Sequence, residues 1–178
     1  GIQTLLLDGL HGITKDKLAK RLAVAVRVNS SVHHLSMVRA NTEIAGITAL
    51  AEALTVNHAI QQLNLSQNPL NDEAISILVK NLKNNFGVHS LWLEHCKFGD
   101  SAVKAIVPWL KTTTVLTKQF HISHNKISEG SNAFLQEAIH SNPALKNLVM
   151  GTLTVQKSIL ARLSALRSDV GALFQSSS

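Results

Sequence analysis

A period of 28 residues runs through the sequence and limits what the chain can fold into. Residues 60–87 align with 32–59 and with 88–115, so that Leu35, Leu63 and Leu91 fall in one place. Similar units span about 2–31 and, after one inserted residue, 116–144, and a partial unit opens a terminal cap over 145–174. Such self-similarity is typical of a solenoid, in which every repeat packs against its neighbours. We therefore expect one repeat domain over 1–178.

Each unit changes its periodicity midway. Leu63 and Leu65 alternate with polar residues, whereas Ala74, Leu78 and Leu82 are spaced by four. Alternation predicts a strand, and a spacing of four predicts one face of a helix. The fold class is therefore α/β, a right-handed βα superhelix with a parallel sheet and outer helices. Because helices are wider than the strand spacing of about 4.8 Å, we expect the sheet to be concave.

Side chains at the turn that follows each strand are expected to bond the turn backbone. Asn68 and Asn125 occupy this position in two units, and Cys96 and Ala40 occupy it in two others. An amide forms good hydrogen bonds to the backbone, a thiol forms weak ones, and a methyl group forms none. The turn of the second unit, which carries Ala40, is therefore expected to be looser.

Other residues mark the helix ends. Asp100 or Ser101 could cap the fourth helix, and Pro108 is expected to kink or shorten it near Trp109. Residues 155–174 read as a helix that closes the open end of the stack.

The pattern LxLxxNxLxxxAxxxLxxxLxxN, from Leu63 to Asn85, resembles the ribonuclease-inhibitor class of leucine-rich repeat. That class includes intracellular immune receptors, activators of the small GTPase Ran and the carboxy-terminal domain of tropomodulins. Cys96 fits it, since both cysteine and asparagine occur at this position in the class. The resemblance implies a fold and only weakly a function.

Within the class, the layout is most similar to that of tropomodulins. The stretches HLSMVRANTEIAGITALAEAL, from His34, and QLNLSQN, from Gln62, resemble the second and third repeats of that family in spacing. In tropomodulins such a domain binds actin at the slow-growing filament end. Residues 40–44 depart from the loop usual in that family, so no actin-binding residues are carried over.

Polar residues between the buried leucines are expected to line the concave face in columns, one residue per repeat. The first column is Thr4, His34, Gln62, Ser90, Gln119 and Asn147, and the second is Leu6, Ser36, Asn64, Trp92, His121 and Val149. The third is Asp8, Val38, Ser66, Glu94, Ser123 and Gly151, and a fourth adds Gln67, His95 and His124.

Trp92 is the residue most typical of a binding site, because a tryptophan ringed by polar side chains is the usual form of a binding hot spot. The predicted protein-binding residues are Trp92, Gln62, Asn64, Glu94, His121, His34 and Gln119. The alternative is that the Trp92 ring lies flat against its neighbours and contributes only stability.

The histidines and the single cysteine do not form the pattern of a metal site or of an active site. His95, His121 and His124 come from adjacent repeats with Cys96 nearby, but Cys96 should point into the turn, and no spacing of a structural zinc module occurs. A Cys96 nucleophile would lack exposure, and phosphate loops and paired carboxylates are missing. An open solenoid sheet offers no pocket. We therefore expect no metal, cofactor, small-molecule substrate or enzymatic activity.

The formal charge of +6 comes from 17 Lys and Arg against 11 Asp and Glu. Cations crowd the first repeat at Lys15, Lys17, Lys20, Arg21 and Arg27, which is either a solvated helix face or a surface for an acidic protein partner. Aromatic residues are too few to favour nucleic acid, and no apolar run could span a membrane. One cysteine excludes an internal disulfide, which favours a cytoplasmic location.

The sequence thus predicts a protein-interaction module that uses its concave sheet. Three alternatives remain. One is a tropomodulin-like domain that caps actin filaments at the cytoskeleton, and another is a module of a secreted bacterial effector that acts in a host cytosol. A third is a structural stack that only supports other segments of a longer protein.

Overall fold

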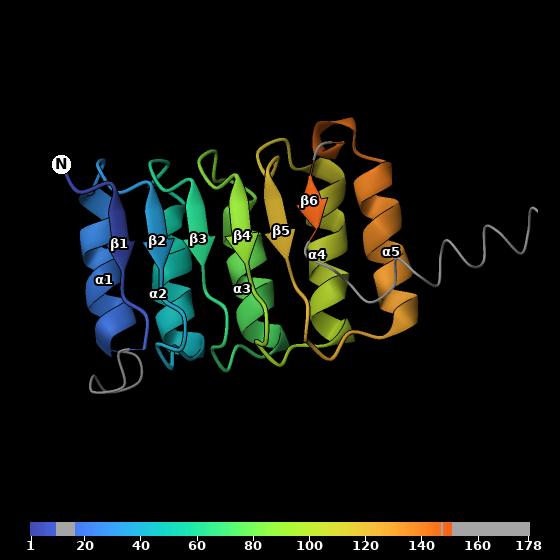
Figure 1. Ribbon diagram of the computed structural model, residues 1–178, viewed down its shortest axis with the longest axis horizontal. Helices are drawn as coiled ribbons and strands as arrows, with labels where there is room; N and C mark the ends of the chain where they lie inside the picture. The colour runs from blue at the N-terminus through green and yellow to red at the C-terminus, as the bar shows by residue number, and fades with distance from the viewer. Residues whose placement is uncertain (10–16, 147, 151–178) are drawn as a thin grey trace, which may run out of the picture.

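The computed structural model describes residues 1–9, 17–146 and 148–150. Strands and helices alternate along the chain, as the change of periodicity predicts (Figure 1). The strands are β1 (Thr4–Leu6), β2 (His34–Ser36), β3 (Gln62–Asn64), β4 (Ser90–Trp92), β5 (Gln119–His121) and β6 (Val149–Met150). The helices are α1 (Lys17–Val28), α2 (Ile44–Leu54), α3 (Asp72–Leu82), α4 (Asp100–Thr112) and α5 (Glu129–His140), followed by the 3₁₀ turn η1 (Pro143–Leu145).

The six strands form one parallel sheet in chain order, and the helices cover one of its faces (Figure 1). Leu35 pairs with Leu63 and Leu63 with Leu91, which confirms the register of 28 residues. The leucine-rich-repeat architecture predicted from the sequence is thereby confirmed. We call the sheet face that carries no helices the concave face.

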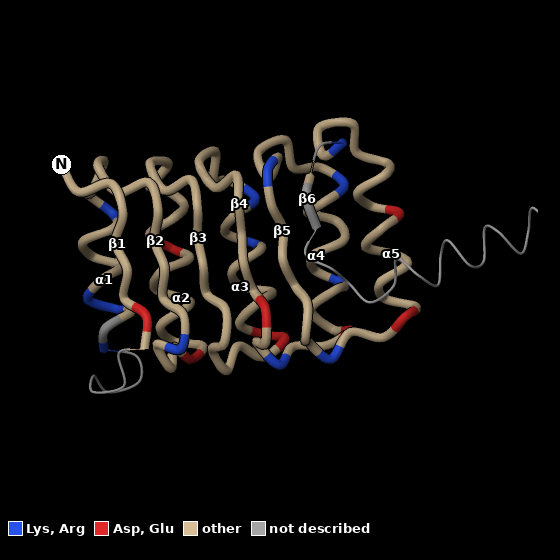
Figure 2. The backbone as a smooth tube through the Cα atoms, in the orientation of Figure 1, with Lys and Arg blue, Asp and Glu red and all other residues tan. Residues whose placement is uncertain are grey.

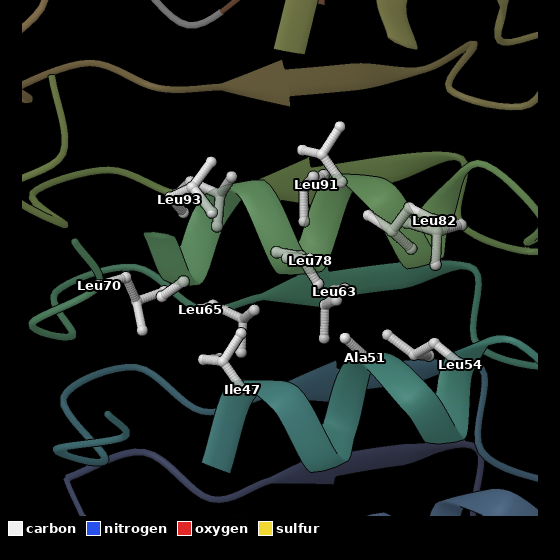
Figure 3. Close-up of a cluster of buried hydrophobic side chains, with 14 of the residues drawn as sticks. Ile47, Ala51, Leu54, Leu63, Leu65, Leu70, Leu78, Leu82, Leu91 and Leu93 are labelled. Carbon is white, nitrogen blue, oxygen red and sulfur yellow. The ribbon is translucent and has the colours of Figure 1, made fainter. Parts of the chain in front are cut away.

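Leucines of the strands pack against the helices to form the core. Leu63 of β3 and Leu65, just after this strand, lie among side chains of α2 and α3, including Leu54 and Leu78 (Figure 3). All four are completely buried. Burial of a leucine contributes about 2 kcal/mol, and every repeat adds the same set to a continuous core.

The turn of the second repeat receives its bonds from the third. The amide nitrogen of Asn68 donates to the carbonyls of Met37 and Leu65, each at 2.8 Å, and its oxygen accepts from the backbone of Thr42 at 3.0 Å. Asn68 therefore compensates for Ala40, which has no polar group. The prediction of a looser turn considered Ala40 alone and left out the hydrogen bonds from Asn68 of the next repeat.

Helix α4 begins without a side-chain cap of its own, so the predicted cap by Asp100 or Ser101 is wrong. Its N-cap is Gly99, and the Asp72 carboxylate of the preceding repeat accepts from the backbone of Gly99 at 2.6 Å and of Ala102 at 3.3 Å. Asp100 acts one repeat further along. Its carboxylate accepts from the Ser128 backbone at 2.9 Å, and this hydrogen bond lowers the pKa of Asp100.

Pro108 does not shorten its helix, so of the two predicted effects the shortening is wrong. Helix α4 has 13 residues and continues through Pro108 to Thr112. Pro108 is exposed, so the carbonyl that loses a helical partner can face water. Trp109 beside it is buried, and its ring meets Phe120 edge to face with the centroids 6.1 Å apart.

A row of asparagines at the helix ends has a role that the sequence patterns did not reveal. Asn57, Asn85 and Asn142 are buried, and the amide nitrogen of each donates to two carbonyls of the preceding repeat. Their side-chain oxygens accept from backbone nitrogens of their own turns. These residues tie successive repeats together at the end where the helices stop.

The register of the last strand differs from the prediction. Gln119 pairs with Val149 and Phe120 with Met150, so Val149 lies beside Gln119 rather than beside His121. The turn η1 lies between the strands and lengthens this repeat to 30 residues, which moves the register by two. Asn147, Gly151 and the expected closing helix over 155–174 lie outside the described residues. In the described part of the chain, no helix is both long and apolar enough to cross a bilayer.

Candidate protein-binding site

Strands β1 to β5 place the predicted columns on the concave face as expected. The first column is formed by the pairs Thr4 with His34, His34 with Gln62, Gln62 with Ser90 and Ser90 with Gln119. The second column is formed by the pairs Leu6 with Ser36, Ser36 with Asn64, Asn64 with Trp92 and Trp92 with His121. The predicted binding residues on these strands therefore share one face.

An aromatic pair lies in the middle of this face. The rings of Trp92 and His121 stack with their centroids 5.8 Å apart and an interplanar angle of 26°. Both side chains are half-buried, so the Trp92 ring is partly covered and partly open to solvent. The Trp92 ring therefore packs flat against one neighbour, as the alternative to a binding role predicts. Part of the ring nevertheless remains exposed.

Polar side chains surround the aromatic pair. Gln62, Asn64 and Gln119 are half-buried, as is His34 two strands away from β4. Their amide and imidazole groups can both donate and accept hydrogen bonds. The neighbouring Ser90 is buried, so the half-buried glutamines and asparagine supply the accessible polar groups beside the two rings.

Glu94 is held by its neighbours and is less available than the other predicted residues. Its backbone nitrogen donates to Ser66 Oγ at 3.1 Å, and its carboxylate accepts from the Ser123 hydroxyl. Asp8 has the same arrangement at the start of the sheet, where it accepts from Ser36 Oγ at 2.6 Å and from the backbone of Val38 at 2.9 Å. Both carboxylates connect adjacent repeats, so their negative charge is fixed in place.

The fourth column follows the edge of the face and has an unusual backbone. Arg39, Gln67, His95 and His124 adopt positive φ angles of 54°, 61°, 54° and 59°. The His95 and His124 rings stack with centroids 4.2 Å apart, and the Arg39 guanidinium donates to the Gln67 side-chain oxygen. Arg39 belongs to this column but was missed in the sequence, where the turn residues of the second unit match the others poorly.

His95, His121, His124 and Cys96, which could have formed a metal site, do not come together around one point. His95 stacks on His124, whereas His121 stacks on Trp92. The Cys96 sulfur is buried and donates to the carbonyls of Leu65 at 3.4 Å and Glu94 at 3.5 Å. Among the described residues, no group of three or more histidines, cysteines or carboxylates could hold a metal ion.

Cys96 is expected to react very slowly in the folded protein. Burial raises the pKa of its thiol from 9.0 to about 12, so the reactive thiolate fraction at pH 8 falls about a thousandfold. Alkylation by iodoacetamide should therefore be about a thousandfold slower in buffer than in denaturant. Since Cys96 is the only cysteine, the measured rate reports on it alone. Equal rates would contradict the buried position.

Because the folded pKa of Cys96 lies above its unfolded value, the related stability is fully present below pH 9. It is lost as the pH rises through about 12. Unfolding curves should therefore shift to lower denaturant concentration above pH 9, and less so for Cys96→Ser.

No model of a protein family and no characterised protein sequence matches this chain. Solved structures do match it. One is described as leiomodin-1 actin-binding site 2, with a TM-score of 0.62, 18% identity, and coverage of 94% of this chain and 88% of the other. Another is the tropomodulin C-terminal domain from Caenorhabditis elegans, with a TM-score of 0.63, 12% identity, and coverage of 92% and 90%. The chain therefore has the leucine-rich-repeat fold and the layout of the tropomodulin C-terminal domain.

Proposed function

We propose that this chain is a non-enzymatic protein-binding module that takes its partner on the concave face, with Trp92 as the anchor. The observation that supports the proposal is the half-buried stack of Trp92 on His121 in the middle of that face. Aromatic anchors of this kind dominate binding energies when polar groups around them exclude water. Gln62, Asn64 and Gln119 would supply specificity, with His34 and Glu94 at the margin.

Two features favour binding over a purely structural role for the aromatic pair. The same column carries Ser36 and Asn64 in the preceding repeats, so the fold does not require a large ring there. In addition, His121 Nε2 is enclosed and has no hydrogen-bond partner among the described residues. An enclosed polar atom without a partner costs stability, about 1–3 kcal/mol. A stack selected for stability alone would avoid this cost.

Actin is the partner that the comparisons favour. The leiomodin-1 structure is described as an actin-binding site, and this chain shares its fold over nearly the whole length. On this proposal the domain works in the cytoplasm at actin filaments, as the tropomodulin-like layout implies. The alternative of a bacterial effector gains no support from either structure.

Trp92→Ala is expected to weaken binding to monomeric actin by about 30-fold, the usual loss for a hot spot of about 2 kcal/mol. Isothermal titration calorimetry with monomeric actin measures this loss. Phe86→Ala is the matched control, because Phe86 is an exposed aromatic outside the strands, and its removal should leave the affinity unchanged. Circular dichroism and thermal melting confirm that both variants remain folded.

Two results would separate the parts of the proposal. If Trp92→Ala is folded and binds actin at full affinity, Trp92 is not the anchor. If the unaltered chain neither binds monomeric actin nor slows elongation at the slow-growing filament end, actin is not the partner.

A further inference from the structure

Helix α1 has an outer face unlike that of any other described helix. Besides Ala25, its exposed residues are Lys17, Lys20, Arg21, Val24, Arg27 and Val28, and we call these six the α1 face. Val24 is 71% exposed and Val28 is 83% exposed. The helix contains four cations and no acidic residue, and its tube carries blue segments and no red (Figure 2). Lys15 of the basic cluster lies outside the described residues.

Helical geometry arranges these six residues in order. The buried residues Ala19, Leu22, Ala23 and Val26 define the inner side of α1. With 3.6 residues per turn, Val24 and Val28 lie one above the other along the middle of the outer side. Lys20 and Arg27 then lie on one side of the valines and Arg21 on the other, while Lys17 lies in line with the valines at the start of the helix. The face is an apolar stripe with cations along both margins.

The two valines are not explained by the needs of the fold. The position of Val24 carries an exposed residue in every other described helix, and three of the four, Glu52, Lys80 and Glu137, are charged, while the fourth is Pro108. The position of Val28 carries the polar residues Asn84, Thr112 and Ser141 in three repeats, and a second valine, Val56, in the repeat next to it. A β-branched residue on an exposed helix surface buries little and has a low helix propensity. Exposed valines between cations therefore indicate a surface that another molecule covers.

We propose that the α1 face binds an acidic amphipathic helix of a partner protein, independently of the concave face. The four cations fit carboxylates on the margins of such a helix, and the valine stripe fits its apolar side. Helix α1 has 12 residues, about 18 Å, which matches some three turns of a partner helix. A lipid surface fits less well, because two valines without an aromatic residue offer little to insert.

The test uses the full chain and two labelled synthetic peptides, followed by fluorescence anisotropy. One peptide is an amphipathic helix of glutamates and leucines, and the other is polyglutamate of the same length. Lys20→Gln/Arg27→Gln should weaken binding of the amphipathic peptide about tenfold. Lys80→Gln/Lys83→Gln on the outside of the third repeat removes the same charge and should change it less than twofold. Equal losses in the two variants would show that only net charge matters and would overturn the proposal.

The valine stripe is tested separately. Val24→Ser/Val28→Ser should weaken the amphipathic peptide about tenfold and leave polyglutamate binding unchanged, because only the first peptide has an apolar side. Equal affinity of this variant and the unaltered chain for the amphipathic peptide would overturn the proposal. Since all these residues are exposed, helicity and melting temperature should be retained in every variant.

Two further measurements identify the class of partner. Phosphatidylserine-containing vesicles should bind more weakly than the amphipathic peptide; vesicle binding that depends on the valines, without peptide binding, would overturn a protein partner. Trp92→Ala should bind the peptide normally. This result distinguishes a failure of the α1 face from a failure of the concave face.

Discussion

Asn85→Ala is expected to lower the free energy of unfolding by about 3 kcal/mol, because it removes four buried hydrogen bonds and leaves their backbone partners without replacement. The Asn85 amide nitrogen donates to the carbonyls of Leu54 at 2.7 Å and Asn57 at 2.8 Å. Its oxygen accepts from the backbone of Gly87 at 2.9 Å and Val88 at 2.8 Å. Asn85 is only 3% exposed, so water cannot take over these bonds.

Urea unfolding followed by circular dichroism measures this loss, and the melting temperature should fall by about 6–12 °C. Asn81→Ala is the matched control. Its amide donates a single bond to the carbonyl of Ile77 on a half-buried helix surface, where alanine favours the helix. The control should change the stability by less than about 0.5 kcal/mol. Equal losses for the two variants would show that the row of asparagines does not hold the repeats together.

Gly87→Ala is expected to destabilise the fold by about 3 kcal/mol, because no space exists for a methyl group. A Cβ atom at this position would lie 2.7 Å from the His58 carbonyl carbon and 2.8 Å from the Ile60 carbonyl oxygen, with the His58 oxygen closer still. All three are backbone atoms, which cannot turn aside as a flexible side chain can, and the two atoms of His58 belong to the preceding repeat. The backbone nitrogen of Gly87 donates a hydrogen bond to the side-chain oxygen of Asn85, so the turn cannot easily move either.

Gly130→Ala provides a control of opposite sign for the same substitution. Gly130 lies in α5, and a Cβ atom there would meet only Ser128 Oγ at 4.0 Å. Alanine should therefore stabilise the protein by about 0.5–1 kcal/mol through its higher helix propensity. Thermal melting of both variants checks the pair. Similar melting temperatures for Gly87→Ala and the unaltered chain would rule out the close approach of the repeats.

The candidate site was predictable in its residues and not in its contacts. Alternation along each strand assigns Gln62, Asn64 and Trp92 to the concave face, because successive side chains of a strand point to opposite sides. The stack of Trp92 on His121 depends on the side-chain torsions of two repeats, which the pattern does not contain. The pairing of Glu94 with Ser123 was missed for the same reason.

Sequence alone determined the repeating unit, the order of strand and helix within it, and the register of the first five strands. These follow from side-chain periodicity, which acts within a few residues of the chain. The tertiary structure decided how one repeat completes the next. Asp72 caps a helix of the following repeat, and Asn68 donates a hydrogen bond to the turn of the preceding repeat. The backbone of His58 excludes a side chain at Gly87. Such contacts depend on the separation and rotation between repeats, and only packing of the core sets these quantities.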